Sequence, residues 1–176
     1  MRASLSIVLC GLGSLGPLAA APARAADLDI RLQIPQLDVA EYHRPYVAAW
    51  LERPDQSVAA NLAVWYDLRK RDHEGEKYLK DLRQWWRRSG RDLQMPADGI
   101  SGATRAVGDY ELKFVPGEAP LAALPAGDYQ LVVEAARESG GRELLKIPFS
   151  WPVQKASALQ AQGNSELGTV TLALRP

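Results

Sequence analysis

The pattern that decides the fold is the stretch Leu28-Asp29-Ile30-Arg31-Leu32-Gln33-Ile34. Apolar and polar side chains alternate in it with a period of two, so its four apolar side chains share one face of a strand. A strand with one apolar face needs a second layer of structure that buries this face. The stretch therefore predicts a sheet that packs against another layer.

Six further segments have the composition of short strands and are bounded by Gly, Pro, Asp or Ser. They are residues 46–51, 58–66, 110–115, 129–135, 142–149 and 168–174. About seven short strands separated by turn signals favour an antiparallel β-sandwich, because parallel βαβ units need long helical crossovers. The sequence thus predicts an all-β fold, with Trp50 and Trp65 in its core.

One helix is predicted, over about residues 76–89, as an insertion between strands. Its apolar stripe recurs at helical spacing and consists of Tyr78, Leu79, Leu82, Trp85 and Trp86. Gly90 follows as a stop signal.

The first 25 residues have the features of a secretory signal peptide. Met1-Arg2 is a short positive start, an apolar stretch opens at Ile7, and the small residues of Ala23-Arg24-Ala25 suit signal peptidase. We expect cleavage before Ala26 or one residue later, which leaves a single periplasmic domain over residues 26–176. Nothing after the cleavage site approaches the ~18 apolar residues of a membrane-spanning helix, so the mature chain is not expected to span a membrane.

Composition excludes several classes of function. Lys plus Arg equal Asp plus Glu, at 21 each, so the bulk charge does not indicate nucleic-acid binding. One Cys cannot form an internal disulfide, and His43 and His73 are too few for a His-rich metal site. Ser101 lacks the Gly-x-Ser-x-Gly context of a hydrolase nucleophile. We predict no metal site and no catalytic residue, and hence a protein that is not itself an enzyme.

The most specific motif is Asp98-Gly99-Ile100-Ser101-Gly102-Ala103-Thr104, in a predicted loop over residues 95–105. Gly99 and Gly102 allow unusual backbone angles, Ala103 adds little bulk, and Thr104 offers a hydroxyl group. One interpretation is a plain turn. The other is a slim peptide that a modifying enzyme threads into its active site.

This motif resembles the flavinylation signal Asp-x-x-Ser/Thr-Gly-Ala/Ser-Thr/Ser. A secreted, magnesium-dependent FMN transferase recognises that signal, takes FMN from FAD and joins its phosphate to the final Thr or Ser. The resemblance implies that Thr104 is the acceptor in this chain. The other residues of the cofactor-binding motif are Asp98, Gly99, Ser101, Gly102 and Ala103.

A wider resemblance covers nearly all of the chain after the predicted signal peptide. The segments that carry it are residues 44–50, 78–86, 98–105, 124–129, 134–138 and 140–142. Together they resemble the predicted periplasmic family known as domain of unknown function 2271. The resemblance implies an immunoglobulin-like β-sandwich found alongside PepSY-type membrane proteins and flavin transferases.

Two functions follow as hypotheses. In the first, the protein is a periplasmic electron carrier with covalent FMN on Thr104, modified by an extracytoplasmic FMN transferase and serving a PepSY-type or cytochrome-type membrane redox protein. In the second, it is a cofactor-free immunoglobulin-like binding or accessory module of a membrane complex, which it contacts through Trp85-Trp86 or an edge strand. The two hypotheses differ at Thr104.

The role of the Trp85-Trp86 pair stays open between two interpretations. The pair is either a stacking face for the flavin, with Arg87, Arg88 and Arg105 balancing negative charge, or part of the apolar core, as aromatic stripes at helical spacing usually are.

Overall fold

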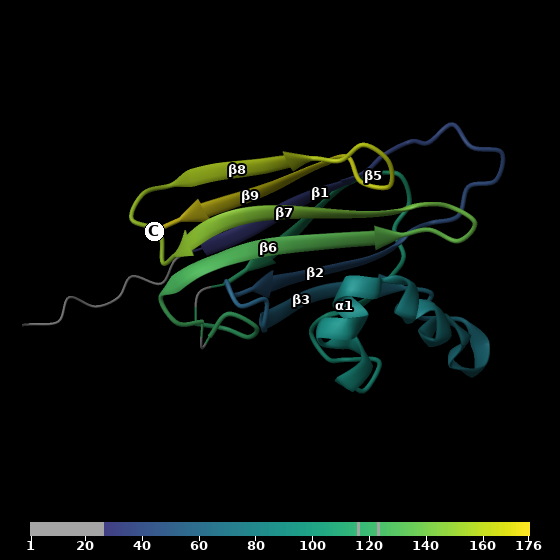
Figure 1. Ribbon diagram of the computed structural model, residues 1–176, viewed down its shortest axis with the longest axis horizontal. Coiled ribbons are helices and arrows are strands. Elements are labelled where there is room, and N and C mark those ends of the chain that lie inside the picture. The colour runs from purple at the N-terminus through teal and green to yellow at the C-terminus, as the bar shows by residue number, and fades with distance from the viewer. Residues whose placement is uncertain (1–26, 116, 123) are drawn as a thin grey trace, which may run out of the picture.

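Two facing β-sheets form the protein (Figure 1) in a computed structural model that describes residues 27–115, 117–122 and 124–176. The predicted signal peptide lies outside these residues. The first sheet has the strand order β5 (Gly108–Phe114), β1 (Asp27–Ile34), β9 (Thr169–Arg175), β8 (Ser157–Gln162). The second has the order β4 (Ser101–Ala103), β3 (Val58–Tyr66), β2 (Tyr46–Glu52), β6 (Gly127–Ala136), β7 (Arg142–Trp151). The predicted all-β sandwich is confirmed.

The pairing within the sheets is antiparallel except at one edge. There, β4 runs parallel to β3. All seven predicted strands are present, whereas β4 and β8 were not predicted. The immunoglobulin-like character of the sandwich stays a prediction.

The main core lies between the two sheets. The alternating stretch in β1 buries its four apolar side chains completely or almost completely, which confirms the orientation predicted for it. They pack against the inward-facing residues of the five-stranded sheet. Trp65 belongs to this core and is 3% exposed.

A second core covers the outer face of the five-stranded sheet. Trp50 lies there, fully buried, together with Tyr66 from β3 and Leu79 and Trp85 from the helical segment. Figure 1 shows the helical segment against this sheet, beside β2 and β3. This sheet is therefore buried on both faces in its middle, and β2 is buried at every residue.

The predicted helix over residues 76–89 is wrong as one continuous element. The chain forms a 3-10 segment η1 (Arg71–Asp81), the α-helix α1 (Arg83–Arg88) and a short 3-10 turn η2 (Gly90–Asp92). Leu82 lies between η1 and α1 with a non-helical ψ of 70°. The apolar stripe is real, because Leu79, Leu82 and Trp85 are all buried.

A buried carboxylate explains why α1 begins as a separate helix after Leu82. Glu134 of β6, at 0% exposure, accepts hydrogen bonds from the backbone N–H groups of Gln84 and Trp85 at 2.8–3.1 Å. The first N–H groups of a helix have no acceptor within the helix, and here the carboxylate of Glu134 accepts their hydrogen bonds as a capping side chain does. Because this contact is tertiary, helical periodicity in the sequence does not reveal it.

Candidate functional site

The flavinylation-like motif begins in a tight turn. Asp98 and Gly99 are exposed, and Gly99 has a φ of +75°, which favours glycine. The turn is closed by hydrogen bonds between Ala97 and Ser101: the Ala97 N–H donates to Ser101 Oγ at 2.9 Å, and the Ser101 N–H donates to the Ala97 carbonyl at 3.0 Å. The first half of the motif is thus a defined turn on the surface.

The second half of the motif is a strand rather than the loop predicted over residues 95–105. The Val64 N–H donates to the Ile100 carbonyl at 2.8 Å, and the Thr104 N–H donates to the Tyr66 carbonyl at 3.1 Å. The residues paired with β3 between these bonds are Ser101, Gly102 and Ala103.

A close steric contact explains why residue 102 of this strand is glycine. A Cβ atom at Gly102 would lie 3.1 Å from Cδ1 of Trp65, its pairing partner on β3. Only a residue without a side chain lets β4 lie at this distance over the indole without a shift of either group.

The direction of β4 decides where Thr104 lies. Because β4 is parallel to β3, both strands end at the same edge of the five-stranded sheet. The antiparallel neighbours place the start of β2 and the turn from β6 to β7 at that edge as well. Thr104 therefore comes next to three segments that are distant in sequence.

The Thr104 hydroxyl group is partly buried beside two charged side chains. Its Oγ1 donates to Asp67 Oδ1 at 3.4 Å, and the other oxygen of Asp67 lies 3.4 Å from Nζ of Lys70. Desolvation opposes the ammonium form, but the hydrogen bond and charge of Asp67 outweigh it and raise the pKa of Lys70 above its usual value. A persistent positive charge thus lies near the Thr104 hydroxyl group.

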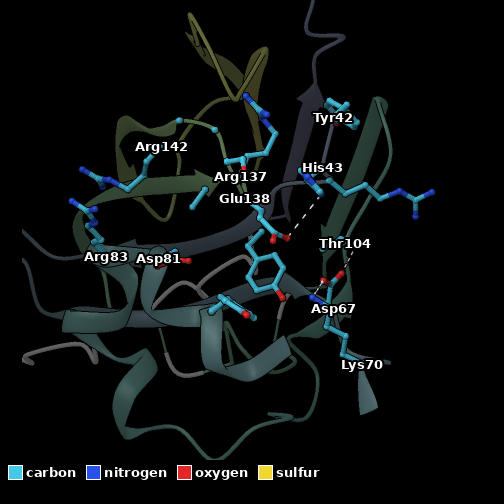
Figure 2. A pocket seen from close by; sticks show the side chains of 17 residues that line it. Tyr42, His43, Asp67, Lys70, Asp81, Arg83, Thr104, Arg137, Glu138 and Arg142 are labelled. Carbon is cyan, nitrogen blue, oxygen red and sulfur yellow. Dashed lines mark hydrogen bonds and ion pairs between the residues drawn. The ribbon is translucent and has the colours of Figure 1, made fainter. Parts of the chain in front are cut away.

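Thr104 also lines a cavity with a volume of about 680 Å³. This volume lies within the range of small-molecule and cofactor sites. In Figure 2, Thr104, Asp67 and Lys70 lie at one end of it, and Asp81, Arg83 and Arg142 lie at the other. Its other walls come from Tyr42, His43, Arg44, Tyr46, Tyr78 and residues 136–141.

One wall of the cavity is held rigidly. In the turn from β6 to β7, Arg137 makes a two-point ion pair with Glu166, at 2.8 and 3.1 Å, and the Gly141 N–H donates to the same carboxylate at 2.8 Å. Both charged side chains are at least nine-tenths buried. A Cβ atom at Gly141 would lie only 2.8 Å from Glu166 Oε1, so glycine is needed for this contact.

Tyrosines and a histidine also line the cavity. The Tyr46 hydroxyl donates to the Gly75 carbonyl at 3.1 Å, and desolvation by burial raises the pKa of Tyr46. Tyr78 is 47% exposed, with Nζ of Lys70 lying 5.3 Å from its ring centre. His43 lies 3.2 Å from a carboxylate oxygen of Glu41 and 3.9 Å from one of Glu138.

A smaller hollow of about 450 Å³ also borders Thr104. Arg44, Asp67 and Lys70 line both this hollow and the larger cavity. Thr104 thus lies between two concave surfaces that have these three charged residues in common.

The tryptophans and arginines considered as partners of the motif lie elsewhere. Trp85 is fully buried in the outer core, so the core interpretation holds for it. Arg105 stacks over Trp65, with its guanidinium carbon 5.2 Å from the ring centre. Arg88 donates to Gln56. Trp86 and Arg87, like these three, lie outside the lining of the large cavity.

Apart from Thr104, the residues that line the cavity were not assigned a functional role from the sequence. Arg44, Tyr46, Tyr78, Arg137 and Arg142 lie in the segments that carry the family resemblance. Their convergence on one cavity depends on strand order and on the packing of η1, which no local pattern encodes. The sequence did contain one indication of this site, because four short segments of the family resemblance begin or end at this edge of the five-stranded sheet.

No group of His, Cys, Asp or Glu residues within the described part of the chain is arranged to hold a metal ion. Across residues 27–115, 117–122 and 124–176, no helix is long and apolar enough to cross a membrane.

Comparison with known proteins gives a family but no characterised relative. A family model described as "Predicted periplasmic protein (DUF2271)" matches residues 27–169. No curated protein and no solved structure matches the chain. The match spans β1 to β8 and reaches only the first residue of β9, and it agrees with the predicted periplasmic location. The chain therefore belongs to the DUF2271 family of predicted periplasmic proteins.

Proposed function

We propose that the protein is a periplasmic electron carrier with FMN attached through its phosphate to Thr104. The observation that carries this proposal is the position of the acceptor of a complete flavinylation-like motif. Its hydroxyl group lies at the wall of a cavity of cofactor size, lined by aromatic side chains and by charged side chains of which most are basic. The residues present therefore suit a phosphate-linked flavin.

The attachment reaction needs only one nucleophile from this chain. The Thr104 oxygen forms a bond to the FMN-side phosphorus of FAD, the P–O bond of the anhydride breaks, AMP leaves, and the hydroxyl proton is released to solvent. The magnesium-dependent transferase supplies the catalytic groups. Asp67, which accepts the hydrogen bond of Thr104, orients this oxygen in the folded chain.

Access to the motif is compatible with modification by another protein. β4 is the edge strand of its sheet, and it has only three residues. The turn that precedes it exposes Asp98 and Gly99. An enzyme can therefore bind the motif from the edge of the sheet without crossing the sandwich core.

Charge next to Thr104 suits a phosphodiester. Lys70, Arg44 and Asp67 line both hollows around the hydroxyl group. Because Asp67 pairs with Lys70, the charge of Arg44 is the one left to offset that of a phosphate placed there. When bound, the flavin supplies the redox chemistry, while the protein supplies attachment, orientation and electrostatics. Its partner in electron transfer is proposed to be a PepSY-type or cytochrome-type membrane redox protein.

The test is the intact mass of the protein exported to the periplasm of a host that contains the FMN transferase. We expect the mass to rise by one FMN minus one water, with the adduct on Thr104. Thr104→Ala should abolish the adduct, and Thr104→Ser should retain it, because the signal accepts either hydroxyl residue. Thr171→Ala, on β9, serves as the matched control and should retain it too.

Two outcomes would contradict the proposal. One is an unmodified mass in a host that flavinylates another protein carrying the same signal. The other is an FMN adduct that persists in Thr104→Ala. The first outcome would favour the alternative, a cofactor-free binding or accessory module.

A further inference from the structure

We propose that the large cavity beside Thr104 is the docking site for the ring system of the attached flavin, which is held against the protein rather than left in solvent. This inference rests on the proposed attachment of FMN to Thr104. It adds a binding site for a planar, partly apolar heteroaromatic ring and assigns residues to that site.

The attachment point and the cavity are contiguous. Thr104 is itself part of the cavity wall, at the end where Asp67 and Lys70 lie (Figure 2). A group linked to Thr104 Oγ1 thus starts at the cavity rather than at a distance from it. Tethering also raises its effective concentration at an adjoining site to the millimolar range, about that expected for short flexible linkers, so even weak ring contacts fill the site.

The cavity offers flat aromatic surface. Tyr42, Tyr46 and Tyr78 line it from the segment before β2, from β2 and from η1. Tyr78 is the most accessible of the three, with 47% of its surface exposed. Aromatic rings pair in offset-stacked or edge-to-face arrangements, which stabilise a pair beyond the area it buries. A planar ring in the cavity therefore covers the exposed face of Tyr78.

The cavity also offers positive charge that is not committed to protein carboxylates. Arg137 and Arg142 are paired with Glu166 and Glu134, respectively. Within the described residues, by contrast, no carboxylate lies within ion-pair distance of Arg44 or Arg83. Guanidinium groups donate readily to carbonyl and anionic acceptors, which the pyrimidine edge of a flavin presents.

The cavity wall made by the turn from β6 to β7 is formed before any ligand binds. The ion pair of Arg137 with Glu166 and the Gly141 hydrogen bond hold the turn from β6 to β7. A preformed site loses less conformational freedom on binding. Tyr42 adds a polar group that a ligand can pair with, because its hydroxyl is buried and has no hydrogen-bond partner among the residues described.

The test uses the flavinylated protein, after its intact mass has shown one FMN on Thr104. Flavin fluorescence and its anisotropy are measured before and after complete proteolysis of the same sample. Proteolysis leaves the ring on a short peptide and provides the reference for a ring free in solvent. We expect the folded protein to show several-fold lower fluorescence, because tyrosines quench a stacked flavin, and higher anisotropy.

Variants then connect this signal to the cavity. Tyr78→Ala and Arg83→Ala alter exposed side chains of the lining and should move fluorescence and anisotropy of the folded protein toward the proteolysed values. Lys77→Ala and Arg91→Ala are the matched controls: both residues are exposed and lie on η1 and η2, outside the lining. The controls should leave the signal unchanged.

The outcomes separate this inference from the one it rests on. If the mass shows no FMN on Thr104, the proposed function fails and the docking site fails with it. If FMN is attached but the folded and proteolysed samples give the same fluorescence and anisotropy, only the docking site is overturned. It is also overturned if the lining variants behave like the controls.

Discussion

The outer faces of the two sheets differ in what lies against them. In the four-stranded sheet, β1 and β9 alternate between fully buried and more accessible residues, and Arg31 is exposed on the outer face. In the five-stranded sheet, the helical segment covers the outer face, and β2 is buried throughout. The same helical segment contributes Tyr78, Asp81 and Arg83 to the cavity. The candidate site thus lies where the second core ends, at the edge of a sheet that is covered on both sides.

The sharpest way to break this comparison is to remove the largest helical side chain of the outer core. Trp85 is fully buried, and its Nε1 donates to Asn61 Oδ1 at 2.9 Å. We expect Trp85→Ala to lower the free energy of unfolding by about 3–5 kcal/mol, measured by urea denaturation. Trp86→Ala, at a partly buried position, should cost less, and Arg31→Ala on the open sheet should stay within about 0.5 kcal/mol. Equal losses in Trp85→Ala and Trp86→Ala would contradict the assignment of Trp85 to the core.

The second prediction concerns the carboxylates of the two sheets. Glu134 binds the start of α1 and accepts from Arg142 at 2.7 Å, so Glu134→Gln should lower the free energy of unfolding by about 2 kcal/mol. Glu111 of β5 is the matched control, because it is exposed and pairs with Lys113 on the open sheet. We expect Glu111→Gln to change stability by less than about 0.5 kcal/mol. A loss of equal size in both variants would show that Glu134 does not hold the helical layer.

The third prediction concerns the contact between β4 and the inner core. Gly102→Ala places a Cβ atom 3.1 Å from Trp65 Cδ1 and should cost about 1 kcal/mol in the free energy of unfolding. The emission of Trp65 should shift as the strand moves. Ala103→Ser, on the same strand and allowed by the flavinylation signal, should remain within about 0.5 kcal/mol of the wild type. An unchanged stability in Gly102→Ala would show that β4 yields without strain.

The smallest change in the free energy of unfolding is expected at Glu143, whose polar contacts join the two sheets. Desolvation would raise the pKa of Glu143, but the backbone N–H groups of Asn164, Leu167 and Ser165 outweigh it and hold the pKa below 4.5. A carboxylate with a lowered pKa stabilises the fold above its unfolded pKa, and this contribution is lost as pH falls through the folded value.

Glu143→Gln should therefore be less stable than the wild type at neutral pH, with a difference that shrinks below pH 4.5. Urea denaturation at several pH values measures this difference. A difference independent of pH would contradict a role for the ionised carboxylate in joining β7 to the turn between β8 and β9.

Local patterns predicted most of the sandwich because its strands either alternate, as in β1, or are rich in β-branched and aromatic residues. β8 was missed because Ser157–Gln162 contains mainly Ala, Gln and Ser, and its pairing with β9 supplies what its composition does not. The break at Leu82 was missed because Glu134, fifty residues away from Gln84, satisfies the first N–H groups of α1.

The candidate site was predicted in part. The motif from Asp98 to Thr104 is recognisable by sequence alone, because its residue types are specified position by position. The cavity was not predictable, because His43, Tyr78, Arg142 and Thr104 come to line it only through the order of strands in one sheet and the packing of η1 against that sheet. Parallel pairing of a three-residue strand leaves no periodic signal in the sequence.

The parallel edge strand has a consequence for the maturation of the protein. β4 contacts the sheet on one side only, over three residues. Such short, peripheral elements open by local unfolding at a small fraction of the global free energy. We therefore expect the strand to detach and re-pair repeatedly while the sandwich stays folded. Under the proposed function, such an opening would present Thr104 to the transferase and then return the modified residue to the same edge.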